Sequence, residues 1–378
     1  MDQHTTELQS SKPTVPHLDL LDQYVLNARR GAPLHVQVYN ALNSLIHEHF
    51  EDGQLFWTEL AIAEKFAVSR GTVRQSLAEL VRDGRLRRYH AKGSFVCKTP
   101  DRSVKIKSVG MFMAEYDSDF LNGMLQYISA ACRENKVRLH VYHTHRDEHV
   151  VSICEQVEAG PEEEAILLME VPGLTEELYD HFSIQGYRIV SMSLPNPDFL
   201  GCVVETDSRD VIAIGMEHLT SLGHRSIALV VNEPSSVLSV QEKIETFQRY
   251  CSENPDVIGT VVDCQTDLWE DSYAAAANNM SAAMENNPTA LFCVSDPGAW
   301  AALAWLSDRN IRVPEAVSVL GFEDVAPSKY VQPPLTTIAH PVEELANTAV
   351  RMLLGEDAQS VRLSPTLVVR SSTGSFSA

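Results

Sequence analysis

One segment near the amino terminus restricts the possible fold of this chain more than any other. It runs from Val68 to Leu80 and reads Val-Ser-Arg-Gly-Thr-Val-Arg-Gln-Ser-Leu-Ala-Glu-Leu. Ser69 suits the amino-terminal cap of a helix, because its hydroxyl accepts a hydrogen bond from a backbone N–H of the first turn. Val73, Leu77 and Leu80 recur at helical spacing. The segment therefore predicts a helix that packs along one face and leaves its polar face exposed.

The region around this helix concentrates positive charge. Between Lys65 and Lys98 the chain has nine Lys or Arg residues and two acidic residues, a local balance of +7. Because the formal net charge of the whole chain is −21, the residues outside this region sum to −28, and the region is positive within an acidic protein. Such a concentration is typical of an element that binds phosphate groups. The alternative, a solvated surface helix without a partner, fits this charge distribution less well.

The segment from Pro33 to Val96 resembles the winged helix-turn-helix domain of GntR-type transcription regulators. The motifs that carry the resemblance are Pro33-Leu34 before a first helix over about 34–51, the spacing of Glu59, Ala63 and Phe66 in a second helix, Val68-Ser-Arg70 with Thr72-Val-Arg74 in a third, and Lys92-Gly-Ser-Phe95 in the wing. This combination is specific, whereas a single Ser-Arg-x-Thr-Val is not.

The resemblance implies which residues contact double-stranded operator DNA. Residues of the third helix enter the major groove, and the tip of the wing approaches the minor groove. The predicted DNA-binding residues are Glu59, Arg70, Thr72, Arg74, Lys92 and Gly93. Leu60 stands where an arginine is common in the family, and Gly71 stands where a bulkier residue is usual. These two departures leave the operator sequence open.

Length and composition indicate a protein of two or three domains. A chain of 378 residues exceeds one typical domain, and an apolar fraction of 44% is ample for packed cores. Apolar runs such as 165–169 are far shorter than the ~20 residues that span a bilayer. The amino terminus has no apolar signal-peptide core, and the seven cysteines show no Cys-x-x-Cys spacing. We therefore expect a cytoplasmic protein with reduced thiols and no membrane partner.

From residue 108 onward, short apolar runs alternate with segments of helical length. The runs that we predict as buried strands are 109–113, 139–142, 165–169, 188–190, 227–231, 260–263, 290–294 and 317–322. The predicted helices include 121–135, 211–222, 299–308 and 342–354. Repeated strand, helix, strand order predicts an α/β fold with parallel sheets, whose ligands bind at the carboxyl ends of the strands. The length of this region suffices for two such lobes.

The same region is similar to the effector domain of LacI/GalR-type regulators, over roughly residues 105–373. The motifs that carry the similarity are Asp207 to Leu219, Leu222 to Ala228, Phe292 to Asp296, Val313 to Asp324, Pro333 to Ile338 and Pro365 to Arg370. That effector domain resembles a periplasmic sugar-binding protein, with two α/β lobes, three crossovers and a cleft. The combination of a GntR-type head with this sensor is similar to arabinose-responsive repressors of bacteria.

Four segments are therefore predicted along the chain. Residues 1–30 form a mobile leader that can dock locally, and residues 31–98 form the winged helix DNA-binding domain. Residues 99–105 form a polar linker. Residues 106–378 form a two-lobed domain, similar to periplasmic binding proteins, for effector binding and dimerisation.

The second resemblance also implies a set of effector-binding residues. The binding arginine of an Arg-x-x-Gly-aromatic motif falls on Lys243, and a lysine lacks the bidentate fork of arginine. Asp296, at the end of a strand, matches a carboxylate that accepts hydrogen bonds from sugar hydroxyls, and Trp269 lies near an aromatic residue that stacks on ligands. The other aligned positions are Ser239, Thr206 and His340.

Several of these assignments have structural alternatives. Asp296 can instead cap the helix that begins near Ala299, Trp269 can be a half-exposed packing residue, and Lys243 can lie on the surface. Histidines at 143, 145 and 149 are residues that metal sites use, but no Cys or carboxylate spacing completes a ligand set. We predict no metal and no cofactor.

Two classes of function remain. The first is a ligand-responsive repressor that binds operator DNA as a homodimer, with an affinity that a sugar or similar small polar metabolite changes through linkage between the two sites. The second is an enzyme domain fused to a GntR-type DNA-binding head. The sequence has no Gly-rich phosphate loop, no Gly-x-Ser-x-Gly and no His-Glu-x-x-His motif, so we predict that the protein is not an enzyme. The effector, the sign of its effect and the target genes are left open.

Overall fold

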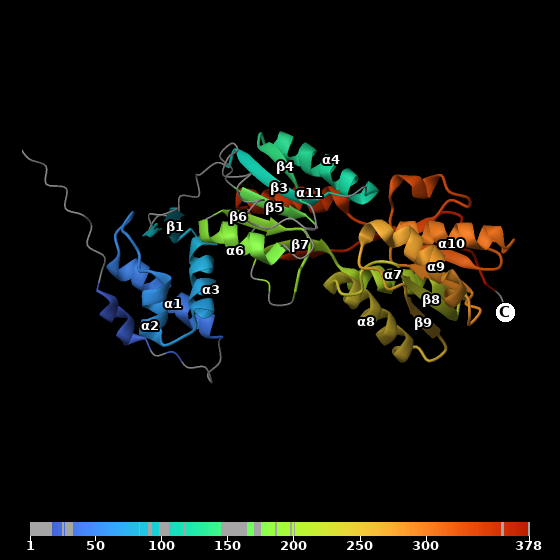
Figure 1. Cartoon of the computed structure of the whole chain (residues 1–378), viewed down its shortest axis with the longest axis horizontal. Helices are drawn as coiled ribbons and strands as arrows, with labels where there is room; N and C mark the ends of the chain where they lie inside the picture. Colours follow the sequence, from blue (N-terminus) through green and yellow to red (C-terminus); the bar gives the residue numbers. More distant parts are fainter. Residues whose placement is uncertain are drawn as a thin grey trace, which may run out of the picture. The chain divides into compact units, whose positions relative to one another are not determined.

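Two compact units make up the chain: Met1–Ile106 with Glu177–Ile189, and Lys107–Glu176 with Val190–Ala378. The computed structural model describes residues 17–24, 26, 33–82, 84–89, 93–97, 106–115, 118–144, 165–169, 175–185, 187–196, 199, 201–356 and 359–376. The predicted linker at 99–105 and much of the predicted leader lie outside these residues. The first unit contains the winged helix head, and the second contains two six-stranded sheets (Figure 1).

Three helices and a two-stranded wing form the head. Their bounds are α1 Leu34–His49, α2 Glu59–Phe66, α3 Arg70–Arg82, β1 Leu86–Tyr89 and β2 Gly93–Val96. The predicted packed face of α3 is confirmed, because Val73, Leu77 and Leu80 are all buried in the core of the head. Phe50, at the end of α1, and Trp57 add an edge-to-face ring pair to this core, with ring centroids 4.9 Å apart.

A short 3-10 helix before the head packs into the same core. This element, η1 (Leu18–Gln23), buries Leu21, which is 1% exposed. Lys65 on α2 donates hydrogen bonds to Asp19 at 2.9 Å and to Asp22 at 2.8 Å. Full burial of a leucine side chain contributes roughly 1.5–3 kcal/mol. Residues 18–23, which belong to the predicted leader, therefore dock on the head.

The carboxyl-terminal lobe is an α/β layer structure. Its sheet has the strand order β14-β12-β11-β10-β8-β9, and β14 is antiparallel to β12 while the other pairs are parallel. The strand bounds are β8 Ser226–Val231, β9 Ile258–Asp263, β10 Ala290–Cys293, β11 Ser318–Glu323, β12 Thr336–Ala339 and β14 Thr366–Val368. The helix bounds are α7 Ser208–Ser221, α8 Leu238–Glu253, η2 Trp269–Asp271, α9 Ser272–Ala283, α10 Asp296–Asp308 and η3 Ala326–Lys329.

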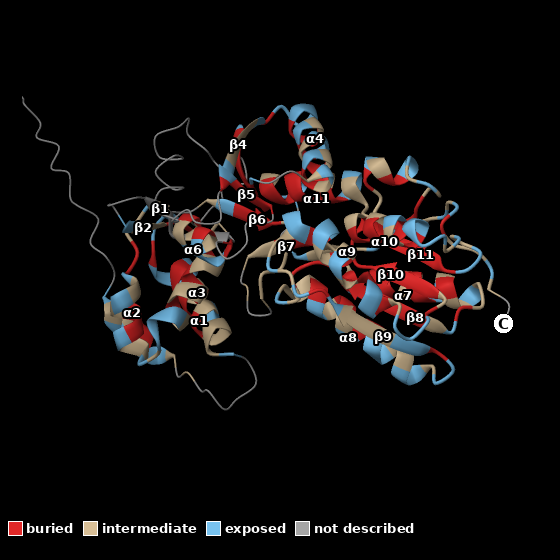
Figure 2. Cartoon of the chain, turned by 45° about the vertical axis from the view of Figure 1, so that its right-hand side comes forward, coloured by how far each residue is buried: buried red, intermediate tan, exposed pale blue. Residues whose placement is uncertain are grey.

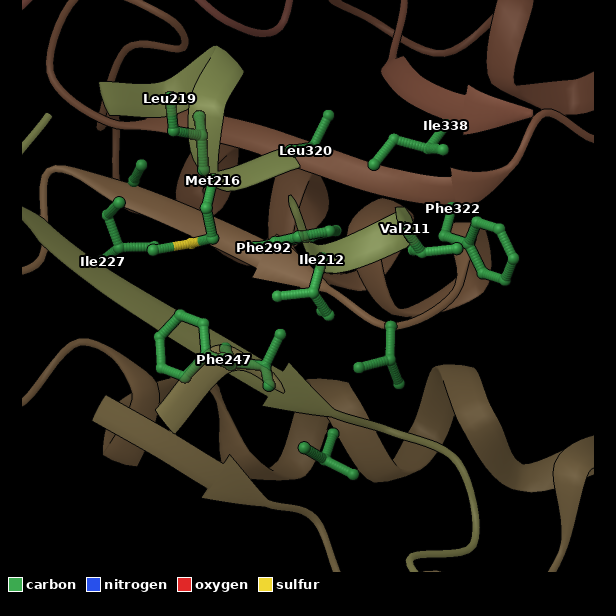
Figure 3. Packing of buried hydrophobic residues seen from close by; sticks show 14 of the residues in the cluster. Val211, Ile212, Met216, Leu219, Ile227, Phe247, Phe292, Leu320, Phe322 and Ile338 are labelled. Carbon is green, nitrogen blue, oxygen red and sulfur yellow. The ribbon is translucent and has the colours of Figure 1, made fainter. Parts of the chain in front are cut away.

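Alternation of side chains along the central strands builds a core on each face of this sheet. On β8, Leu229 packs with α7 and α8, while Val230 packs with α9 and α10 on the opposite face. Figure 3 shows the first of these cores, in which Phe292 and Met216 lie among residues of α7, α8 and the sheet. The central strands β8, β10 and β11 are consequently buried on both faces (Figure 2).

The amino-terminal lobe has a second sheet, of order β13-β7-β6-β5-β3-β4. The strand bounds are β3 Ser108–Ala114, β4 Arg138–Thr144, β5 Ala165–Met169, β6 Arg188–Ser191, β7 Cys202–Thr206 and β13 Val361–Leu363. The helices of this lobe are α4 Asp119–Glu134 and α11 Val342–Leu354, which pack against each other. Between β5 and β6 the chain forms α6 Thr175–Gln185, whose residues from Glu177 onward belong to the first unit. Every described residue of β3 and β5 is buried, so both faces of these strands are covered.

Three chain segments cross between the lobes. They follow β7, β12 and β13, at about residues 207, 340 and 364. The predicted fold class, a winged helix head with a two-lobed α/β domain of parallel sheets, is confirmed. Of the helices in the described part of the chain, none is both long enough and apolar enough to cross a membrane.

Candidate DNA interface and effector site

The amino-terminal end of α3 is fixed by its predicted cap. The hydroxyl oxygen of Ser69 accepts a hydrogen bond from the backbone N–H of Thr72 at 3.0 Å and lies 2.8 Å from the hydroxyl of Thr72. These contacts satisfy one of the orphan N–H groups of the first turn. They also hold Thr72 in place beside Arg70 and Arg74, two further residues predicted to contact DNA.

Glu59 joins the two predicted DNA-reading arginines. As the first residue of α2, it accepts hydrogen bonds from Arg70 at 3.2 Å and from Arg74 at 3.3 and 3.4 Å. The side chain of Arg70 is 63% exposed and that of Arg74 is 41% exposed, whereas that of Glu59 is 18% exposed. The structure therefore groups three of the predicted DNA-binding residues, with both guanidinium groups accessible to solvent.

The wing contributes one further predicted residue to the described structure. Gly93 begins β2 with a φ of +103°, a conformation that side-chain-bearing residues rarely adopt. A Cβ at this position would also lie 3.0 Å from Leu55 Cδ1. Position 93 therefore favours glycine both for its backbone conformation and for the limited space beside Leu55. Lys92, the other residue predicted there, lies outside the described residues.

Two predicted effector residues meet where the lobes join. The Oγ1 atom of Thr206, at the end of β7, lies 2.6 Å from Nδ1 of His340, which follows β12. The ring of His340 packs between Phe120 of α4 and Phe322 of β11, at centroid distances of 4.5 and 4.3 Å. Burial, together with the charge of Lys243, lowers the pKa of His340 to about 3, so its ring is neutral at physiological pH. His340 thus touches both lobes.

Lys243 lies in the same group rather than on the surface. Its side chain is buried on α8, donates a hydrogen bond to Glu233 Oε2 at 3.2 Å, and lies 4.6 Å from the ring centroid of Phe322. Glu233 follows β8 at the carboxyl end of the sheet. A buried ammonium group requires such a partner, because desolvation of an isolated charge is costly. The structure therefore brings Lys243, Thr206 and His340 together around Phe322.

Asp296 occupies a different environment from the one that the sequence predicts. It is 0% exposed, and its carboxylate accepts hydrogen bonds from the hydroxyl of Ser328 at 2.6 Å, the hydroxyl of Thr337 at 2.6 Å and the backbone N–H of Val325 at 3.1 Å. Burial raises the pKa of Asp296 to about 7, although these three hydrogen bonds act in the opposite direction. Because the carboxylate is enclosed by its own lobe, the direct ligand contact predicted for it does not fit this structure.

In this structure the carboxylate of Asp296 binds the loop that follows β11. Ser328 and Val325 both belong to this loop, and Trp300 of α10 also donates a hydrogen bond to Ser328, at 3.0 Å. A Cβ on Gly321 would lie 2.3 Å from Asp296 Oδ1, so the glycine leaves room for the carboxylate beneath the strand that carries Phe322. Asp296 is the first residue of α10 and Ser295 is its cap residue, so the predicted alternative, in which Asp296 caps a helix that begins near Ala299, is wrong.

The remaining predicted effector residues lie in two elements of the carboxyl-terminal lobe. Ser239 is in the first turn of α8, four residues before Lys243 and therefore on the same face of the helix. Trp269 begins η2, is half-buried, and its carbonyl accepts a hydrogen bond from the hydroxyl of Ser272 at 2.5 Å.

An ion-pair network that the sequence did not reveal links the two lobes. Arg362 of β13 donates to Glu205 of β7 at 2.9 Å and to both carboxylate oxygens of Glu242 of α8, at 2.9 and 3.1 Å. Burial raises the pKa of Glu205, while the N–H of Leu194 and the charge of Arg362 act in the opposite direction. Beside this network the hydroxyl of Ser364 donates to Asp210 at 2.6 Å. Arg362 and Glu242 are 120 residues apart, so local sequence carries no signal for their pairing.

Comparison with known proteins assigns both parts of the chain. Residues 34–96 match the family of bacterial regulatory proteins named gntR, and residues 216–373 match the periplasmic binding protein-like domain. The arabinose metabolism transcriptional repressor of Geobacillus stearothermophilus is 27% identical over 341 residues, which cover 84% of this chain and 90% of that protein. The HTH-type transcriptional repressor PurR of Haemophilus influenzae (strain PittEE) is 26% identical, covering 73% of this chain and 84% of that protein.

A solved structure shares the fold of the second unit. It is a LacI family transcriptional regulator from Enterococcus faecium with bound ribose, with a TM-score of 0.61 and 19% identity, covering 72% of this chain and 100% of that one. The chain therefore combines a segment that matches the gntR family of bacterial regulatory proteins with a periplasmic binding protein-like domain, and over most of its length it is similar to transcriptional repressors.

Proposed function

We propose that the chain is a transcriptional repressor whose affinity for operator DNA changes when a sugar or similar small polar metabolite binds between its two lobes. The observation that carries this proposal is the contact of His340 with Thr206 and Phe120 of one lobe and with Phe322 of the other. A ligand bound at this point touches both lobes, so its binding free energy depends on how they are arranged. A ligand with such a preference shifts the equilibrium between arrangements.

A pentose is the first candidate effector. A relative of this chain is a repressor of arabinose metabolism, and a protein with the same fold holds ribose. The neutral imidazole and the rings of Phe120 and Phe322 suit the apolar face of a sugar, while hydroxyl groups find donors and acceptors in Thr206 and the Lys243–Glu233 pair. Because that pair is electrically balanced, it favours a neutral ligand over an anionic one. The proposed effector residues are Lys243, His340, Thr206, Trp269 and Ser239, with Asp296 as a positioning residue.

Ligand-dependent stability tests this proposal most simply. We expect arabinose, ribose or a related sugar to stabilise the full chain in a thermal-shift screen, since a ligand at ~100 times its Kd adds ~2.7 kcal/mol to the free energy of unfolding. The sugar that stabilises the chain should also change its affinity for operator DNA. A panel of pentoses and hexoses that leaves both quantities unchanged would exclude a sugar as the effector.

We further propose that the regulator binds DNA as a homodimer. Helix-turn-helix proteins usually read two half-sites related by a two-fold axis, which a symmetric dimer matches. Analytical ultracentrifugation at micromolar concentration should give the mass of two chains, and the operator should be an approximate palindrome. The mass of a single chain, alone and on DNA, contradicts this.

The ion pair between the lobes should contribute to the effector response. Glu242→Gln removes the charge that binds Arg362 across the lobes but leaves the pair of Arg362 with Glu205. We expect the variant to bind the effector several-fold more weakly, because the lobe arrangement held by the ion pair becomes less favourable. Glu245→Gln, an exposed change on the same helix, is the matched control. Isothermal titration that gives equal or tighter binding for Glu242→Gln would remove the ion pair from the response.

A further inference from the structure

One arginine in the head has a buried donor without an acceptor. Arg88 lies on β1, opposite Ser94 of β2 in the wing. Its side chain is half-buried, and its Nε is buried without a hydrogen-bond partner. Burial lowers the pKa of Arg88, which reflects the unfavourable surroundings of its charge. A buried N–H without an acceptor costs free energy, so any acceptor that comes to Arg88 is favoured.

The segment that leads into α2 is paired with the wing next to Arg88, because the backbone N–H of Phe56 donates to the carbonyl of Ser94 at 2.7 Å and Ser94 lies opposite Arg88. The charge of Glu59 raises the pKa of Arg88, and the charge of Arg74 lowers it. In the free head, Glu59 accepts from Arg70 and Arg74 instead, at distances of 3.2 to 3.4 Å. Strong hydrogen bonds between charged groups measure about 2.7–2.9 Å. Three arginines therefore compete for one carboxylate, and the two that hold it do so through long contacts.

Operator DNA changes this competition. The exposed side chains of Arg70 and Arg74 can turn toward phosphate oxygens and base edges, which are strong acceptors. The side chain of Glu59 is mostly buried at the start of α2, so it does not follow the two arginines toward the DNA. We propose that, when the head binds its operator, the carboxylate of Glu59 exchanges its hydrogen bonds with Arg70 and Arg74 for hydrogen bonds with Arg88. The resulting pair then positions α2 against the wing. Arg88 is then a positioning residue for sequence-specific binding, a role that is independent of any effector.

The test is a double-mutant cycle in the full chain, with Glu59→Gln, Arg88→Met and the double variant. Arg87→Met is the matched control, because it removes the same charge from an exposed neighbour on the same strand. The measured quantity is the specificity ratio, the affinity for operator DNA divided by the affinity for unrelated DNA, at several salt concentrations. This ratio is insensitive to partial unfolding, because an unfolded head loses both kinds of binding.

We expect each single variant to reduce the specificity ratio about tenfold and the double variant to reduce it no further, since both remove the same pair. The salt dependence of operator binding by Arg88→Met should match that of the unmodified chain, and Arg87→Met should keep the specificity ratio. Two results would overturn the proposal. One is a double variant in which the fold-reduction of the specificity ratio equals the product of the two single reductions. The other is a loss of about one phosphate contact from the salt dependence in Arg88→Met, which would mean that Arg88 binds DNA directly.

Discussion

Asp296→Ala is expected to lower the free energy of unfolding of the carboxyl-terminal lobe by about 3 kcal/mol or more, because it leaves buried donors without an acceptor. The donors are the hydroxyls of Ser328 and Thr337 and the N–H of Val325. Urea unfolding followed by tryptophan fluorescence measures this loss, since Trp300 donates to Ser328 in the affected loop. Operator affinity without effector should be retained, because the head belongs to the other unit.

Asp296→Asn is the matched control, and it isolates the charge of the carboxylate. The folded protein raises the pKa of Asp296 from 3.8 to about 7, so between these values the folded state keeps a proton that the unfolded state has released. Stability from this group is therefore present at low pH and is lost as the pH rises toward 7. The unmodified chain should lose stability relative to Asp296→Asn from about pH 4 to about pH 7. An Asp296→Ala chain that is as stable as the original contradicts the positioning role.

Arg74→Ala is expected to weaken operator binding by about 1–3 kcal/mol, roughly a five- to 150-fold increase in Kd, if Arg74 reads a base. On binding DNA, Arg74 is expected to replace its hydrogen bonds to Glu59 with contacts to the operator, and 41% of its side chain is already exposed in the free head. The discrimination between operator and unrelated DNA should fall together with the affinity. Fluorescence anisotropy with labelled operator and competitor DNA measures both quantities.

A control for Arg74→Ala must remove the same charge away from DNA. Arg309→Ala does this, because Arg309 is exposed on the carboxyl-terminal lobe and stacks on Trp305 at 3.8 Å. If both variants lose affinity equally, the effect of Arg74 reflects only net charge. If Arg74→Ala keeps its full affinity and specificity, Arg74 does not belong to the DNA interface.

The parts of the structure that the sequence predicted well depend on local signals. The cap at Ser69 and the buried face of α3 both follow from residues within one helix. The buried strands were predicted from short apolar runs, and β3, β5 and β8 agree with these predictions to within one residue at either end. Four strands were missed: β7, β12, β13 and β14. The strands β13 and β14 have three residues each, which is too short for an apolar pattern, and β7 and β12 each have two polar residues at one end.

The parts that were not predicted depend on contacts between residues that are distant in the sequence. The position of Asp296 at the end of a strand was visible, but its enclosure by Ser328 and Thr337, 32 and 41 residues later, was not. Glu233, the partner of Lys243, was not predicted, although its position directly after a buried strand was a signal that could have marked it as a site residue. Leu21 lies in a weakly amphipathic segment whose docking depends on a core formed by three other helices.

Operator binding by the full chain, titrated with the sugar that stabilises it, tests the central claim most directly. The account predicts a change in operator Kd of at least about tenfold at saturating sugar, which corresponds to about 1.4 kcal/mol of coupling between the two sites. It also predicts that the double variant Lys243→Met with Glu233→Gln, which removes the buried charge pair without leaving one charge unpaired, binds the operator normally but no longer responds to the sugar. A sugar that stabilises the chain yet leaves operator affinity unchanged would contradict the account.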